Sequence, residues 1–249
     1  RQITDHYMNS LSHLHVRSRF NRFCVVRQLC RYIAQTGSCC YVPESMRHIS
    51  ASKVFHPYIF GEHEIKGLLL AASTLLPVNS LRPHTYRTLF GLLYTTGIRI
   101  SEAFSLTLND FHGELDLLYI AEGKFKKARW VPLHPSTSTI LNQYVEHRLQ
   151  FGPKTPESPL FINLRTRRLR HCTVYQAFRQ LLEKCGIPHN KHTGPRIHDL
   201  RHTFAVQRLL AWYKDKQDVN TCLPALATYM GHVDVCSTHV YLHPTAELL

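Results

Sequence analysis

Hydrophobic positions in the first forty residues recur at spacings of three and four. That spacing places them along one side of an α-helix. The apolar positions are Phe20, Phe23, Val26, Leu29, Cys30 and Ile33. The pattern predicts an amphipathic helix that ends at Gly37-Ser38 and is followed by a loop-like stretch closing at Pro57.

From Tyr58 the helical periodicity returns in longer runs. It predicts helices over 62–75, from Arg82-Pro83 to Gly97, over 135–150, over 173–184 and over 223–230. Residues 115–120 and 128–133 read as two strands of a hairpin, and 159–163 as a short third strand. The expected fold is therefore mainly α with a small antiparallel β-sheet, of the α+β class.

The change of pattern near residue 57 also predicts the domain organisation. Residues 1–56 form a small helical region with a linker from about residue 38, and residues 57–249 form a larger mixed domain. Neither an internal repeat nor a low-complexity tract interrupts either part.

The net charge of the chain indicates what kind of partner it binds. Lys and Arg number 30 against 17 acidic residues, a formal net charge of +13. Such an excess favours a polyanionic partner, and nucleic acid before a membrane surface. The polar face of the first helix carries arginines with no acid between them, which favours phosphate contacts over a merely solvated face. Candidate DNA-contacting residues are Arg17, Arg19, Arg22, Arg27, Arg31, Lys126, Lys127, Arg165, Arg167, Arg168 and Arg170.

Several classes of protein are disfavoured. No run of about 18 apolar residues exists, so a membrane span is not expected. The eight cysteines include no C-x-x-C pair, so we expect reduced thiols in an intracellular protein and no zinc site built on them. The chain begins at Arg1 rather than Met, and we expect it to be a fragment.

The richest chemistry lies between Arg196 and His243. This stretch holds His198-Asp199-Leu200-Arg201-His202, then Gly231-His232, and then Tyr241 nine residues after that histidine. A guanidinium binds phosphate oxygens in a planar fork, imidazoles exchange protons near neutral pH, and a tyrosine hydroxyl can be a nucleophile. The set predicts phosphoryl transfer from a nucleic-acid backbone to tyrosine.

The two histidines at 198 and 202 also suit a zinc pair, since they lie four apart with an acid between them. Against zinc, a third ligand at the expected spacing is missing, and Arg201 would place a cation beside the metal. We interpret His202 as a structural histidine and predict no metal site.

A second motif, Thr96-Gly97-Ile98-Arg99-Ile100-Ser101-Glu102, follows the predicted helix end at Gly97. A single arginine after a helix is usually a surface cation, but Glu102 could pair with an arginine and orient it. A third motif is the basic hairpin Gly123-Lys124-Phe125-Lys126-Lys127 between the first two predicted strands.

Together the motifs T-G-x-R-x-S-E, H-x-x-R and G-H, with Tyr nine residues on, resemble those of the tyrosine recombinase (phage integrase) family. The resemblance implies an integrase-type catalytic domain preceded by a helical core-binding domain. It assigns the catalytic residues Arg99, Lys124, His198, Arg201, His232 and Tyr241, with Lys126 and Lys127 as rivals of Lys124. Glu102 would orient the arginines.

The implied function is site-specific cleavage and rejoining of double-stranded DNA through a 3′-phosphotyrosyl intermediate, without cofactor or metal. The resemblance also implies a homo-oligomer, with a dimer on each site and a tetramer in the synapse, and a place in the bacterial cytoplasm at the nucleoid. Two alternatives stay open: DNA relaxation of the type IB topoisomerase kind, and a DNA-binding regulator with an inactive site.

Overall fold

The computed structural model describes residues 2–44, 57–121, 128–190, 194–232, 238 and 241–242. The chain divides into two compact units, residues 1–55 and 56–249. Lys124, Lys126 and Lys127 lie outside the described residues. Within the described part of the chain, no helix is long and apolar enough to cross a membrane.

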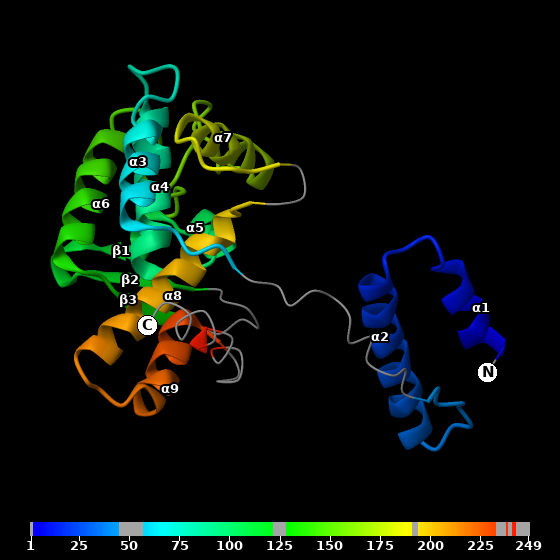
Figure 1. The fold of residues 1–249 in the computed structure, drawn as a ribbon. Coiled ribbons are helices and arrows are strands. Elements are labelled where there is room, and N and C mark those ends of the chain that lie inside the picture. The colour runs from blue at the N-terminus through cyan, green and yellow to red at the C-terminus, as the bar shows by residue number, and fades with distance from the viewer. Residues whose placement is uncertain are drawn as a thin grey trace. The chain divides into compact units, whose positions relative to one another are not determined.

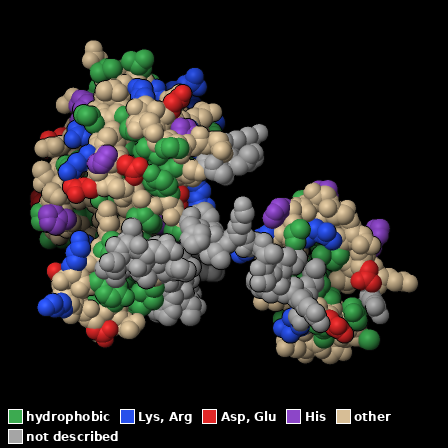
Figure 2. Space-filling view, viewed as in Figure 1, with side chains coloured by type: hydrophobic (Ala, Val, Ile, Leu, Met, Phe, Trp, Pro, Cys, Tyr) green, Lys and Arg blue, Asp and Glu red, His purple; other side chains and the backbone are tan. Residues whose placement is uncertain are grey.

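The first unit contains helices α1 (Gln2–Ser10) and α2 (Val16–Gln35). His15 begins α2, and its Nδ1 accepts a hydrogen bond from the Arg17 backbone at 3.3 Å. Phe23 is buried, whereas Leu29 is 56% exposed. Leu29 therefore does not belong to the packed face that its spacing predicted. Apolar side chains lie on the surface of this unit among basic ones (Figure 2).

Helix α4 (Leu81–Thr96) lies at the centre of the second unit. It packs against α3 (Glu62–Ala72), α6 (Pro135–Arg148) and α8 (Ile197–Lys214), and Figure 1 shows α3, α4 and α6 side by side. Leu89 and Phe90 of α4 are fully buried, since apolar side chains occupy several sides of this helix. The described residues of this unit also form helices α5 (Ile100–Ser105), α7 (His171–Lys184) and α9 (Val219–Met230).

A small antiparallel sheet adjoins these helices. Its order is β1 (Phe111–His112), β2 (Leu117–Ile120) and β3 (Arg129–Pro132), with Leu118 opposite Val131. Short 3-10 turns at Leu108–Asp110 and Gly113–Leu115 flank β1. The predicted α+β class with a small antiparallel sheet is confirmed.

The prediction of a third strand at 159–163 is wrong. Residues Pro159 and Ile162 make only single bridges, to Thr107 and Arg168, and the third strand is β1 instead. The apolar run Leu160, Phe161 and Ile162 is buried throughout, so its side chains do not alternate between a core face and a solvent face. Continuous burial of a short apolar run does not by itself specify a strand.

Two apolar clusters fill the second unit. The larger one joins α3, α4, α6, α7 and the sheet, with Leu68, Phe90 and Phe178 among its most buried members. The smaller one joins α8 and α9 and includes Tyr241. The junction of the two clusters places α8, α9, α5 and β3 close together, and the candidate site forms there.

Candidate active site

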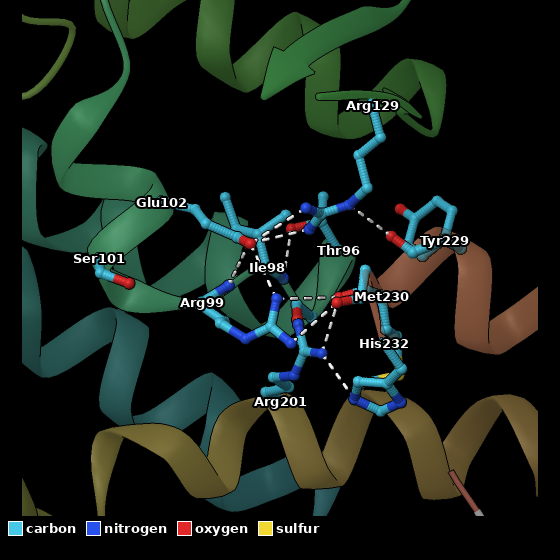
Figure 3. Close-up of polar contacts among 12 residues, drawn as sticks. Thr96, Ile98, Arg99, Ser101, Glu102, Arg129, Arg201, Tyr229, Met230 and His232 are labelled. Atoms are coloured by element: carbon cyan, nitrogen blue, oxygen red, sulfur yellow. Dashed lines mark hydrogen bonds and ion pairs between the residues drawn. The ribbon is translucent and has the colours of Figure 1, made fainter. Parts of the chain in front are cut away.

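The end of helix α9 collects two of the predicted arginines. Met230 is its last residue, and Gly231 follows in the left-handed conformation with φ 67°. The final carbonyls of a helix lack partners within the helix. Arg99 donates to the Gly231 oxygen at 3.0 Å, and Arg201 donates to the Met230 oxygen at 2.8 Å (Figure 3). Arg201 also donates to the Gly97 oxygen at 2.5 Å, so both guanidinium groups converge on one place.

Arg99 is the residue that begins helix α5, and Glu102 lies on the first turn. The Glu102 carboxylate accepts from the Arg99 backbone at 2.8 Å and from its guanidinium at 2.9 Å. It also accepts two hydrogen bonds from Arg129 of β3, at 3.0 and 2.8 Å. Burial raises the pKa of Glu102, but the bonds from Arg129 and Arg99 outweigh it and leave the pKa below its usual value. Glu102 is therefore an ionised carboxylate between two arginines.

His232 has a defined tautomer. Its Nε2 lies 2.9 Å from Arg201 Nη2, and its Nδ1 lies 2.7 Å from Thr238 Oγ1. Because a guanidinium can only donate, Nε2 must accept, and the ring proton of the neutral form is then on Nδ1 and is donated to Thr238. Burial and the charges of Arg201 and Arg99 lower the pKa of His232 to about 4. At neutral pH the ring is an uncharged acceptor.

Tyr241 is buried, with 3% of its surface exposed. Its ring is nearly parallel to that of His232, with centroids 6.0 Å apart, and meets the ring of His202 edge-on at 5.3 Å. Burial raises the pKa of Tyr241, while the charge of Arg201 and a hydrogen bond with it act in the opposite direction. The phenol therefore keeps its proton until a base removes it.

His198 and His202 stand one turn apart on α8, with ring centroids 4.9 Å apart and nearly perpendicular planes. Burial, followed by the charge of His198, lowers the pKa of His202 to about 3. His198 is the more open of the two, and desolvation and then the charge of Arg201 lower its pKa as well. Within the described ranges, no three His, Cys, Asp or Glu residues gather as a metal site would require.

This arrangement suits transfer of a phosphoryl group. The guanidinium groups of Arg99 and Arg201 supply positive charge that can bind a phosphate and stabilise negative charge on it. Uncharged imidazoles can accept a proton, and the phenol beside them can act as the nucleophile once that proton leaves.

The predicted DNA-contacting arginines occupy different surroundings. In the first unit Arg17, Arg22 and Arg31 are exposed, while Arg19 and Arg27 are half-buried. Arg27 also donates to the Pro43 oxygen at 2.9 Å.

Arg165, Arg167 and Arg170 are exposed beside a hollow of about 680 Å³. Arg168 lines the same hollow, but its guanidinium donates to the Phe104 and Ser105 oxygens at 2.9 and 2.8 Å. One nitrogen of its guanidinium, Nη1, is thus already bonded to α5.

Sequence reasoning missed two residues that border the site. Arg129 lay inside a predicted strand, and Thr238 carried no motif. A weak signal existed for each, since Arg129 closes the basic hairpin and Thr238 lies six residues after His232. The role of Arg129 depends on Glu102 and Tyr229, which are 27 and 100 residues away, and no local pattern shows such partners.

Comparisons with known proteins agree with this geometry. The family model described as the phage integrase family matches residues 60–247. The chain is 37% identical over 231 residues to a Sinorhizobium fredii (strain NBRC 101917 / NGR234) protein whose name includes integrase/recombinase y4rB. That match covers 90% of this chain and 73% of the relative. It is 28% identical over 219 residues to tyrosine recombinase XerD of Lacticaseibacillus casei, covering 88% of this chain and 69% of that protein.

Solved structures show the same fold. XerH site-specific recombinase bound to palindromic difH substrate matches with a TM-score of 0.71 at 20% identity, over 99% of this chain and 69% of that one. The Tn1549 transposon integrase in complex with transposon right end DNA matches with a TM-score of 0.73 at 17% identity, over 96% and 79%. With a family model that spans both arginine motifs, the paired histidines and the tyrosine, this chain belongs to the phage integrase family of tyrosine recombinases.

Proposed function

We propose that this tyrosine recombinase cuts and rejoins double-stranded DNA at specific sites through a covalent bond between Tyr241 and the 3′ phosphate. The observation that carries the proposal is the convergence of Arg99, Arg201, His232 and Tyr241 at the end of α9. Arg201 touches both the His232 ring and the tyrosine, so one guanidinium links the phosphate position to the nucleophile.

The reaction needs one bond formed and one broken. The Tyr241 oxygen attacks the scissile phosphorus, and the bond from phosphorus to the 5′ oxygen of the next nucleotide breaks. Arg99 and Arg201 stabilise the charge that grows on the two nonbridging oxygens. The phenol proton passes to a neutral imidazole, His198 or His232, both of which have lowered pKa values. His232 can accept it only through Nε2, once Arg201 donates to the phosphate instead.

The leaving 5′ oxygen also needs a proton, and we assign its donation to Lys124, with Lys126 and Lys127 as alternatives. Rejoining reverses these steps with the 5′ hydroxyl of another strand. The energy of the broken bond is held in the phosphotyrosine, so the proposed reaction requires neither ATP nor a metal ion.

The partners follow from this reaction. Double-stranded DNA is the substrate, and exchange between two sites calls for two copies on each site and four in the synapse. The first unit would hold the DNA through exposed arginines of α2 such as Arg22 and Arg31. A bacterial cytoplasmic location at the nucleoid would give access to such DNA.

A nicked suicide substrate tests the proposal, because loss of a short 5′ fragment traps the covalent complex. Wild-type protein should give an adduct that survives SDS, and it should do so in EDTA. Tyr241→Phe should bind the DNA and give no adduct. Tyr229→Phe is the matched control, since this nearby phenol is bonded to the Pro132 oxygen at 3.2 Å and has no assigned chemistry.

Two results would overturn the proposal. An adduct formed by Tyr241→Phe would identify another nucleophile. Loss of all cleavage in EDTA, restored by zinc, would favour a metal-dependent hydrolase.

A further inference from the structure

The Arg129 side chain makes three hydrogen bonds that the pairing of β3 with β2 does not require. Its Nη1 and Nη2 donate to the two oxygens of Glu102 at 3.0 and 2.8 Å, and its Nε donates to the Tyr229 oxygen at 2.9 Å (Figure 3). Only 11% of its side chain is exposed. A planar fork bound to a carboxylate on one edge and a carbonyl on another has a single allowed orientation.

The carboxylate that Arg129 binds is the one that orients Arg99. Each oxygen of Glu102 accepts one bond from Arg129 and one from Arg99. A carboxylate offers about four lone-pair positions, so these bonds fill its capacity. Arg129 therefore both fixes the carboxylate and shares its negative charge with Arg99.

Arg129 also supports the turn that follows α9. A Cβ atom added at Gly231 would lie 2.7 Å from its Nη1, so the guanidinium packs directly on this glycine. The Gly231 oxygen in turn accepts from Arg99 at 3.0 Å, and His232 is the next residue. Arg129 thus contacts both Glu102, which binds Arg99, and Gly231, which precedes His232.

We infer that Arg129 is a positioning residue for cleavage, which keeps Arg99 aimed and charged toward the scissile phosphate. Without it, Glu102 pairs with Arg99 alone and neutralises more of its charge, and the Tyr229 carbonyl loses its partner. The inference rests on the proposed function, because the scissile phosphate belongs to that reaction. The contacts of Arg129 with Glu102, Tyr229 and Gly231 do not depend on it.

The experiment compares Arg129→Met and Arg129→Lys with wild type in single-turnover cleavage at saturating DNA. We expect Arg129→Met to cleave about 10- to 100-fold more slowly, as small misplacements of catalytic groups do. Its DNA affinity should change by less than about 2-fold, because Arg129 is half-buried and its guanidinium donates to Glu102 and Tyr229 rather than to solvent. Arg129→Lys keeps the charge without the fork and should be intermediate.

A substrate with a neutral methylphosphonate at the scissile position separates positioning from general damage. Its transition state carries one negative charge fewer, so it depends less on an accurately aimed guanidinium. We expect the loss in Arg129→Met to shrink to less than about 3-fold on this substrate. Arg148→Met is the control, because Arg148 is also buried and bonded to carbonyls but lies away from the site.

A third measurement does not need catalysis. Titration of the full chain with inorganic phosphate, followed through the Nε–H signals of Arg99 and Arg201 by NMR, should show phosphate binding weakened about 3-fold or more in Arg129→Met. If wild type forms no adduct, the proposed function fails and this titration still decides the positioning role. Equal cleavage by Arg129→Met and wild type, equal losses on both substrates, or unchanged phosphate binding would each overturn the inference.

Discussion

Burial and neighbouring arginines set the protonation states of individual side chains at this site. His202 and His232 have pKa values of about 3 and about 4, far below that of a solvated histidine. In both, desolvation is the leading cause and nearby positive charge adds to it. Thr238, buried against His232, selects which nitrogen carries the proton. Burial and neighbouring charge therefore keep both rings uncharged at neutral pH.

Replacing Thr238 by Val should test whether Thr238 sets the tautomer of His232. Val keeps the volume but removes the oxygen that accepts from His232 Nδ1, leaving a buried N–H without a partner. We expect the free energy of unfolding to fall by about 1–3 kcal/mol and single-turnover cleavage to slow. Thr238→Ser keeps the hydroxyl and should retain both. Nitrogen-15 chemical shifts of His232 report the tautomer, and an unchanged Nδ1–H form in the Val variant would contradict this account.

The lowered histidine pKa values also predict a pH dependence of stability. Below about pH 6.5 the unfolded chain binds protons at both histidines, whereas in the folded chain His202 binds one only near pH 3 and His232 only near pH 4. Stability should therefore fall as the pH drops from about 6.5 to about 4, by at most ~1.4 kcal/mol per pH unit for each histidine.

Urea unfolding at about pH 7, 6 and 5 measures this slope. His202→Gln removes one of the two contributions, so its stability should fall less steeply with decreasing pH. A slope equal to that of wild type would show that His202 is not held neutral in the folded protein.

Glycines in the left-handed conformation follow helices α4 and α7 of the second unit. Gly97 ends α4 with φ 62°, and Gly186 follows α7 with φ 66°. They differ in their surroundings: a Cβ at Gly97 would lie 2.4 Å from the Phe204 ring, whereas a Cβ at Gly186 would meet nothing within 4 Å. Gly97 is therefore a close contact between α4 and α8 as well as a turn.

We expect Gly186→Ala to cost about 1–2 kcal/mol, the conformational penalty of a left-handed residue. Gly97→Ala should cost about 1–3 kcal/mol more, because Phe204 must move. It should also slow cleavage, since the Gly97 oxygen accepts from Arg201 and Arg99 lies two residues on. Thermal or urea unfolding of both variants measures the difference. Equal losses of stability would mean that Phe204 moves without cost.

At the scale of the whole molecule, positive charge is distributed over both units. The net charge is +13, and the α2 arginines lie in a unit that contains none of the proposed catalytic residues. Phosphate contacts release counterions, so DNA affinity should fall steeply with salt, with a slope of about −0.9 per contact in log K against log salt. The two units can therefore be tested separately.

Deleting residues 1–56 should weaken DNA binding and flatten the salt slope by several units, if about five basic residues of the first unit contact phosphates. Fluorescence anisotropy over a salt series gives both values. Circular dichroism should show that residues 57–249 remain folded. A truncated protein with the salt slope of the full chain would mean that the α2 arginines are a solvated face.

The positions of helices could be predicted from the sequence because the interactions that begin and end a helix join residues close together in the chain. Apolar spacing, Pro83 and Gly97 marked α4 closely, since helix hydrogen bonds and caps join residues a few positions apart. The same holds for the Arg99–Glu102 pair, which lies within one turn of α5. The segment 159–163 was mistaken for a strand because an apolar run indicates burial but not pairing.

Only the tertiary structure decided how these pieces become a site. Glu102 and Arg129 are 27 residues apart, and the α9 carbonyls that hold Arg99 lie more than 130 residues beyond it. The sequence by itself supplied the arginines, histidines and tyrosine and their order. Their convergence, the burial that lowers the histidine pKa values and the place of Arg129 depend on long-range packing, because desolvation and shared hydrogen bonds exist only between groups that the folded chain brings into contact.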